Sequence, residues 1–156
     1  MGILLAIQGA ASQGVLWGIM ALGLYITFKV LDFADLTVDG SFALGGAVSA
    51  VLLVNGWNPF LSLIIAFIAG GISGVVTGLL HTKLEIPGIL AGILTMIALY
   101  SINIRIMGQA NTPLLGVDTI MVKLEILLGI DRTLSSLVTG VVFSVVIIMI
   151  LYWFFG

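Results

Sequence analysis

Three carboxylates stand within eight residues in the first third of the chain, at Asp32, Asp35 and Asp39. They belong to the run LDFADLTVDG, which separates two long hydrophobic stretches. Ionisable groups at membrane depth are tolerated only when buried in protein or lining a watery cavity, so they are functional candidates. Three interpretations stay open: a transport path or gate, a structural cap in which Asp39 caps a helix beginning near Ser41, or an ordinary solvated loop.

The rest of the chain offers little for catalysis or metal binding. The chain has no cysteine, so it can form neither a disulfide nor a thiolate metal site. It has one histidine, which does not make a zinc site by itself. There is no glycine-rich loop ending in Gly-Lys-Ser or Gly-Lys-Thr, and no carboxylate pair placed with a histidine for hydrolysis. We therefore predict no enzyme activity, no metal and no cofactor, and the lack of a basic patch argues against nucleic-acid binding.

The elements that position these residues are predicted to be membrane helices. Apolar residues make up 61% of the chain and charged residues 8%, which leaves too little polar surface to coat a soluble domain. We predict one all-α transmembrane domain over residues 1–156, a polytopic helical bundle of about five spans. The uncharged stretches place the spans at 3–28, 41–55, 59–80, 87–104 and 133–155.

The second span is the unusual one. Its 15 residues after Gly40 are too few to cross a bilayer, which takes roughly 20 residues. We therefore predict a broken or short second helix, with Leu36–Gly40 already at membrane depth. Asn103, near the end of the fourth span, is a further candidate because it could face a vestibule that receives substrate. The predicted translocation pathway or gate residues are Asp32, Phe33, Asp35, Thr37, Asp39 and Asn103.

Glycines recur at helix-contact spacing and are predicted to serve helix packing. Small residues let helix backbones approach closely in lipid, where no hydrophobic drive favours helix association. The predicted packing positions are Gly14, Gly18, Gly70, Gly74, Gly78, Gly88 and Gly92. Between the last two spans, the amphipathic pattern of residues 116–129 predicts a short helix, either lying in the membrane interface or partly buried as a connecting helix with no function beyond packing.

Two long runs carry a family resemblance. These are ALGLYITFKVLDFADLTVDGSFALGGAVSAVLL and GLLHTKLEIPGILAGILTMIALYSINIRIMG. They resemble the permease subunits of bacterial ABC importers of the branched-chain amino acid type, and within that family the tryptophan/tyrosine-type uptake permeases. The resemblance covers nearly the whole chain. It departs from the family's usual Asn-Pro at Ile86-Pro87.

The resemblance implies an ATP-driven importer of aromatic or branched-chain amino acids, or of a similar small metabolite, in the bacterial plasma (inner) membrane. It implies an ABC ATPase, an extracytoplasmic substrate-binding protein and a second permease copy as partners, and a cytoplasmic side for residues 29–39 and 81–85. Family members are nearly twice this length, so we expect an N-terminal half that lacks the helix docking on the ATPase. The alternatives are half of an ion-coupled secondary transporter or channel, in which the three carboxylates bind a coupling ion, and a helical membrane scaffold.

Overall fold

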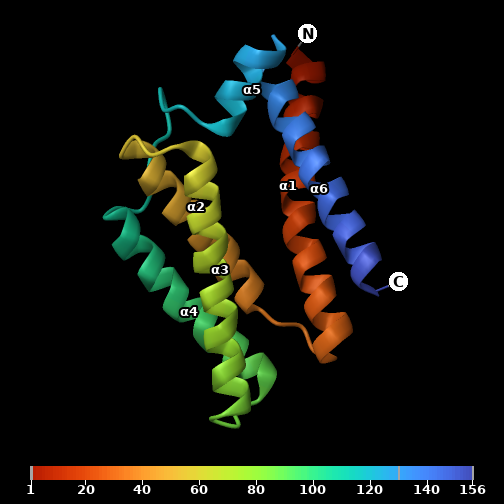
Figure 1. Ribbon diagram of the computed structural model, residues 1–156, viewed down its shortest axis with the longest axis vertical. Helices are drawn as coiled ribbons and strands as arrows, with labels where there is room; N and C mark the ends of the chain where they lie inside the picture. The colour runs from red at the N-terminus through yellow and green to blue at the C-terminus, as the bar shows by residue number, and fades with distance from the viewer. Residues whose placement is uncertain (1, 130, 156) are drawn as a thin grey trace. The chain divides into compact units, whose positions relative to one another are not determined.

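The computed structural model describes residues 2–129 and 131–155, and within them it contains six α-helices and no strand (Figure 1). Five of the helices are long and apolar enough to cross a membrane, and α5 is the short one. The predicted all-α transmembrane fold is thus confirmed. The helices are α1 (Gly2–Leu31), α2 (Thr37–Val54), α3 (Pro59–Thr82), α4 (Gly88–Met107), α5 (Ile120–Leu128) and α6 (Arg132–Phe155).

Contacts within the chain form two compact units. One comprises Met1–Leu22 with Thr119–Gly156, and the other Gly23–Asp118. We call them the α6 unit and the α2–α4 unit. The prediction of one domain over residues 1–156 stays a prediction, and its positions 1, 130 and 156 lie outside the described residues.

Hydroxyl groups hold the α6 unit together. Ser12 of α1 and Ser136 of α6 place their hydroxyl oxygens 2.7 Å apart, and the Ser135 hydroxyl donates to the Met121 carbonyl of α5 at 3.0 Å. The short helix predicted within 116–129 is present as α5. It begins after Thr119, whose hydroxyl accepts the Val122 N–H at 3.2 Å, and it ends at a glycine in the left-handed conformation, as helices often do.

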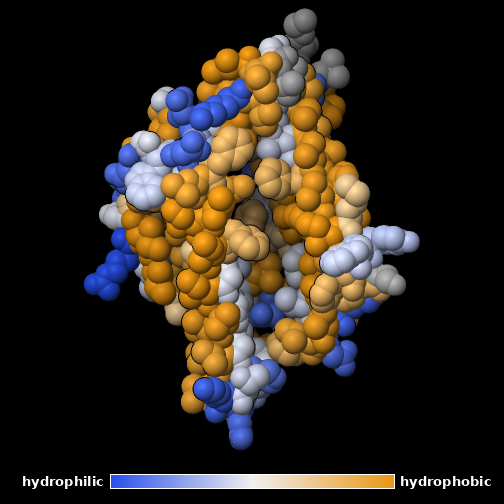
Figure 2. Space-filling model, viewed as in Figure 1, coloured by the Kyte–Doolittle hydropathy of each residue, from blue (hydrophilic) through white to orange (hydrophobic). Residues whose placement is uncertain are grey.

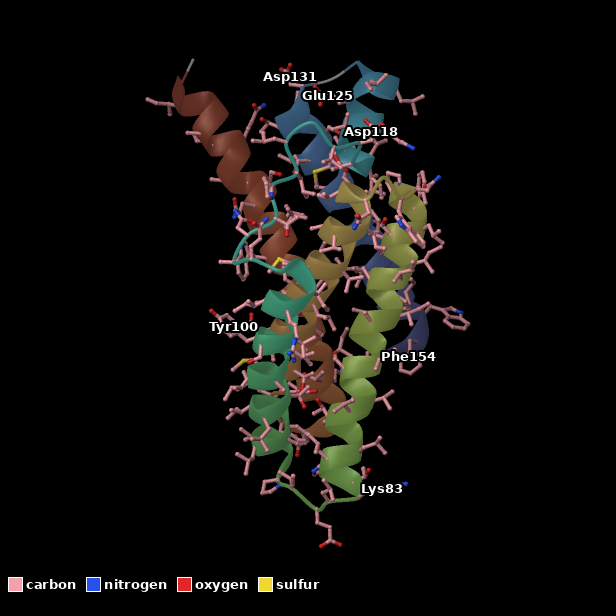
Figure 3. All side chains as sticks on the ribbon, turned by 90° about the vertical axis from the view of Figure 1, so that its left-hand side faces the viewer. Lys83, Tyr100, Asp118, Glu125, Asp131 and Phe154 are labelled. Atoms are coloured by element: carbon pink, nitrogen blue, oxygen red, sulfur yellow. The ribbon has the colours of Figure 1, made fainter. Side chains whose placement is uncertain are left out.

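In the α2–α4 unit, α3 runs antiparallel to α2, and α4 runs parallel to α2 (Figure 1). A short turn joins α2 to α3, between the spans predicted at 41–55 and 59–80. Asn58 accepts the Phe60 N–H at 2.9 Å and caps α3, while Pro59 occupies a first-turn position where its missing N–H leaves no partner unpaired. Away from the α3–α4 turn, α3 and α4 diverge (Figures 1 and 3).

The second helix is short, as predicted, but it starts earlier than the 41–55 span. It begins at Thr37 and has 18 residues, giving it a length of about 27 Å. The break lies before it, at residues 32–36, where Asp32 has a φ of 61°. The interpretation in which Asp39 caps a helix near Ser41 is wrong, because Asp39 already lies in the first turn of α2. Asp35 provides the side-chain acceptor instead.

Polar and apolar side chains are distributed opposite to the pattern of a soluble protein. Large apolar residues cover the outside (Figure 2), and Phe67 of α3 is 82% exposed. Tyr100 points away from α4 (Figure 3). The buried side chains include many hydroxyl groups, among them Ser62, Ser73, Thr77 and Thr95. This distribution fits a hydrocarbon environment, in which polar groups must find their partners inside the protein.

Candidate functional site

The segment between α1 and α2 packs against α3 and α4. Together with Thr37, the first residue of α2, it comprises residues 32–37, and we call it the joint. Its first anchor is the Phe33 ring, which meets the His81 ring edge-on with centroids 5.6 Å apart. The ring also fills the space above Gly88, where an added Cβ would overlap it. His81 is held in turn by its Nδ1, which lies 2.8 Å from the Ile86 carbonyl. The joint and the α3–α4 turn therefore share one end of the unit.

The second anchor is the Asp35 carboxylate. It is 8% exposed, and its Oδ1 accepts the Thr37 N–H at 2.9 Å, satisfying one of the free donors at the start of α2. A negative group is also favoured at that end of the helix dipole. Gly92 of α4 makes room for it, because a Cβ there would lie 2.6 Å from Asp35 Oδ1 and 3.1 Å from the Leu36 nitrogen.

The third anchor is a ladder of three threonine hydroxyls, one from each helix. Thr37 of α2 lies 2.7 Å from Thr77 of α3, and Thr77 lies 2.9 Å from Thr95 of α4. The Thr95 hydroxyl donates to the Ala91 carbonyl at 3.0 Å. Each hydroxyl has a single proton, so if Thr77 donates to Thr95 then Thr37 donates to Thr77. The ladder thus satisfies its polar groups without water.

The joint lies inward of the helix ends. Gly92 is the fifth residue of α4, about 6 Å from its start, and Thr77 is about 8 Å from the end of α3. Lys83 marks the turn beyond them (Figure 3). At this point the backbone of the joint packs closely against Gly92 of α4.

The structure does not gather the three carboxylates. Asp32 and Asp39 are exposed, and only Asp35 is buried. Within residues 2–129 and 131–155, no group of three or more His, Asp or Glu side chains could hold a metal ion. Thr37 is 2% exposed and Phe33 is half-buried, so of the five residues predicted in this segment two are buried and one is half-buried.

Asn103 lies apart from the joint. It is about 16 Å further along α4 than Gly92, so the sequence-based candidates do not form one cluster. It is 5% exposed, and its side-chain oxygen has no hydrogen-bond partner within the described part of the chain. A buried amide oxygen without a partner is unusual and marks the position for explanation.

The predicted packing glycines fall into two groups. Gly88 and Gly92 sit against the joint, and Gly70 has the Ser41 carbonyl 4.0 Å from its would-be Cβ. The others show no atom within 4 Å of that position among the described residues, so packing through them stays a prediction; they are Gly14, Gly18, Gly74 and Gly78. Gly40, which the prediction missed, approaches the Met96 backbone with a would-be contact of 3.0 Å.

Sequence reasoning also missed Thr77 and Thr95. The available signal was weak: Ser73 and Thr77 stand four residues apart in an otherwise apolar stretch, which places them on one face of a helix. Which hydroxyls meet across helices depends on how each helix is rotated. Hydropathy does not specify that rotation.

Together these contacts hold the connection between α1 and α2 against α3 and α4. The joint contains an aromatic anchor, a buried carboxylate and a polar ladder. A chain with five helices able to span a membrane is a polytopic membrane protein.

The comparison with known proteins specifies the class further. Residues 6–156 match the family described as branched-chain amino acid transport system permease components. The chain belongs to this family, and the resemblance seen in the sequence is thereby confirmed. No solved structure gives a significant match.

Two curated relatives match part of their own length. A protein of Clostridioides difficile (strain R20291) named tyrosine transport system permease protein is 48% identical over 103 residues, covering 66% of this chain and 35% of that protein. An uncharacterized protein of Rickettsia prowazekii (strain Madrid E) is 38% identical over 142 residues, covering 91% of this chain and 49% of that protein. The chain thus spans no more than about half the length of either relative.

Proposed function

We propose that this chain is the N-terminal half of the membrane permease of an ATP-driven importer, and that it carries part of the translocation path for an amino acid. The observation that carries the proposal is the joint, whose residues Phe33, Asp35 and Thr37 pack against α3 and α4. A permease needs an element with two arrangements that a partner can bias. Family membership supplies the transport class, and the joint is the candidate for that element.

The arrangement of carboxylates favours this function over ion coupling. A coupling-ion site at a broken helix would bring several carboxylate or carbonyl oxygens together. Here Asp32 and Asp39 are exposed, and the Asp35 oxygen is engaged by the first turn of α2.

The substrate proposal rests on relatedness. The Clostridioides difficile relative is named for tyrosine transport, so we propose an aromatic amino acid, with branched-chain amino acids next. We further propose an ABC ATPase on the cytoplasmic side, an extracytoplasmic binding protein, a permease homodimer, location in the bacterial plasma membrane, and no catalysis by the permease itself.

Transport in proteoliposomes tests the proposal. The permease is reconstituted with its cognate ATPase, with binding protein and labelled tyrosine outside and ATP enclosed. Two forms are compared, residues 1–156 and the chain continued through the second half found in its relatives. We expect uptake that requires ATP, resists ionophores and is confined to the longer form, which alone should also retain the ATPase on purification.

Variants of the joint provide the site-specific arm. Thr37→Val removes the first rung of the ladder, and Asp32→Asn alters an exposed carboxylate of the same segment as a control. We expect Thr37→Val to reduce uptake and Asp32→Asn to preserve it. Uptake driven by an ion gradient without ATP, equal ATPase retention by both forms, or equal uptake by the two variants would each contradict the corresponding part of the proposal.

A further inference from the structure

A pocket of about 290 Å³ opens in the α2–α4 unit beside the threonine ladder. It lies where α3 and α4 diverge beyond the contact between Thr77 and Thr95 (Figure 1), and Leu44 of α2 contributes to its wall. α3 and α4 provide the rest of the lining, through Ala69, Ile72, Ser73, Val76, Thr95, Ala98, Leu99 and Ile102.

The position of the pocket is central within the helices. Ala69 is the eleventh of the 24 residues of α3, and Ala98 the eleventh of the 20 residues of α4. Ile72 is 60% exposed and Ile102 is also exposed, whereas Leu44 and Leu99 are buried. The pocket therefore opens sideways, between exposed apolar side chains of α3 and α4, at the depth where lipid chains surround the protein.

The two hydroxyl residues in the lining do not make the pocket polar. The Ser73 hydroxyl donates to the Gly70 carbonyl at 2.6 Å, and the Thr95 hydroxyl donates to the Ala91 carbonyl while accepting from Thr77. With their protons engaged, they leave the lining apolar. A free amino acid carries an ammonium and a carboxylate, and both groups would lose their hydration here without gaining hydrogen-bond partners. A water molecule would likewise lack the two to four polar partners that a buried water usually has. The lining therefore selects hydrocarbon.

We propose that this pocket binds an acyl chain of a membrane lipid, held between α3 and α4 with Leu44 behind it. Its volume is nearly twice that of a ~150 Å³ cavity that binds benzene, so a chain segment fits. Because the pocket opens laterally at hydrocarbon depth, the acyl chains of the surrounding lipids can enter it directly. The inference goes beyond the proposed transport function and does not depend on it.

Photo-crosslinking in nanodiscs tests this site. The probe is a phosphatidylethanolamine with a diazirine midway along one acyl chain, in a phosphatidylethanolamine and phosphatidylglycerol bilayer. Cross-linked residues are mapped by mass spectrometry. We expect labelling per residue at Ile72, Val76 and Ile102 to exceed that at the outward-facing Phe67 by about tenfold, which corresponds to about 1.4 kcal/mol of preferential occupancy.

Filling the pocket supplies the matched control. Ala98→Phe places a ring in the lining, whereas Ile97→Phe places one on the exposed neighbouring position outside it. We expect Ala98→Phe to abolish the enrichment and Ile97→Phe to retain it. Ala69→Phe repeats the test from the opposite wall should Ala98→Phe fail to give a monodisperse, helical protein.

Several results would overturn the proposal. One is labelling that is uniform along α3 and α4; another is an enrichment that survives both filling variants. A third is obtained with a photoreactive amino acid at Ile102: capture of a protein segment, from a second copy or from the remainder of a longer permease, in place of lipid would show that a helix covers the pocket.

Discussion

The close approach of α4 to the joint makes Gly92→Ala a sharp test of the structure. The added Cβ would lie 2.6 Å from Asp35 Oδ1, whereas ordinary contacts begin at 3.4 Å. The carboxylate cannot withdraw freely, because it accepts the Thr37 N–H at 2.9 Å. The Leu36 nitrogen, 3.1 Å from the same Cβ, belongs to the backbone and limits movement on the other side.

The expected cost follows from these contacts. Overpacking costs about 1–3 kcal/mol and loss of the helix cap about 1 kcal/mol, while replacing a helical glycine by alanine returns up to about 1 kcal/mol. We therefore expect Gly92→Ala to lower the free energy of unfolding by about 1–3 kcal/mol. At 2 kcal/mol, the unfolded-to-folded ratio rises about 30-fold.

Gly46→Ala in α2 is the matched control. No atom lies within 4 Å of its would-be Cβ among the described residues, so it should gain the helix-propensity term alone. Unfolding of both variants and the parent chain is followed in mixed micelles by titration with a denaturing detergent, with helix content read by circular dichroism. If Gly92→Ala proves as stable as Gly46→Ala, the joint does not pack against α4 as described.

Three further predictions concern the ladder, the isolated amide and the burial of the joint. Thr77→Val leaves two hydroxyls of the ladder without their partner and should cost about 1–3 kcal/mol in the same unfolding assay, whereas Thr82→Val, at an exposed hydroxyl bonded only within its own helix, should change stability by less than about 0.5 kcal/mol. Asn103→Leu removes a buried amide oxygen that has no partner among the described residues, so we expect unchanged or higher stability in that assay; a clear loss would show that the amide has a partner. Since the chain has no cysteine, single cysteines report access directly: Asp32→Cys should react rapidly with a large maleimide and Thr37→Cys slowly, and equal rates would contradict the burial of the joint.

The spans could be predicted because lipid imposes a simple rule. A run of uncharged, apolar residues of sufficient length has few alternatives to a membrane helix, and Asn58-Pro59 marked where one helix ended and the next began. The start of α2 was harder. Asp39 was interpreted as a cap because it precedes an uncharged run. A carboxylate is equally favourable within the first turn of a helix, and Asp39 lies there because α2 begins at Thr37.

The candidate site was only partly predictable for a related reason. The run that includes Phe33, Asp35 and Thr37 stood out by composition, yet its partners did not. Thr77 and Thr95 are ordinary residues in apolar helices, and they matter only because tertiary packing turns their hydroxyls toward Thr37. Regular glycine spacing was equally ambiguous: Gly92 fits against a carboxylate, whereas Gly74, at the same type of spacing, faces no described atom.

The close packing of Asp35 against Gly92 also constrains the order in which the helices of this protein can assemble. The ribosome releases α2 and α3 before α4, so the hydroxyls of Thr37 and Thr77 can pair while the nascent hairpin enters the bilayer. The Asp35 carboxylate has no such early neighbour in another helix, because Gly92, against which it packs, lies 57 residues further along the chain and is synthesised later. Before α4 inserts, the Asp35 side chain lacks its packing against Gly92, so we expect the joint to close only once the fourth helix has arrived.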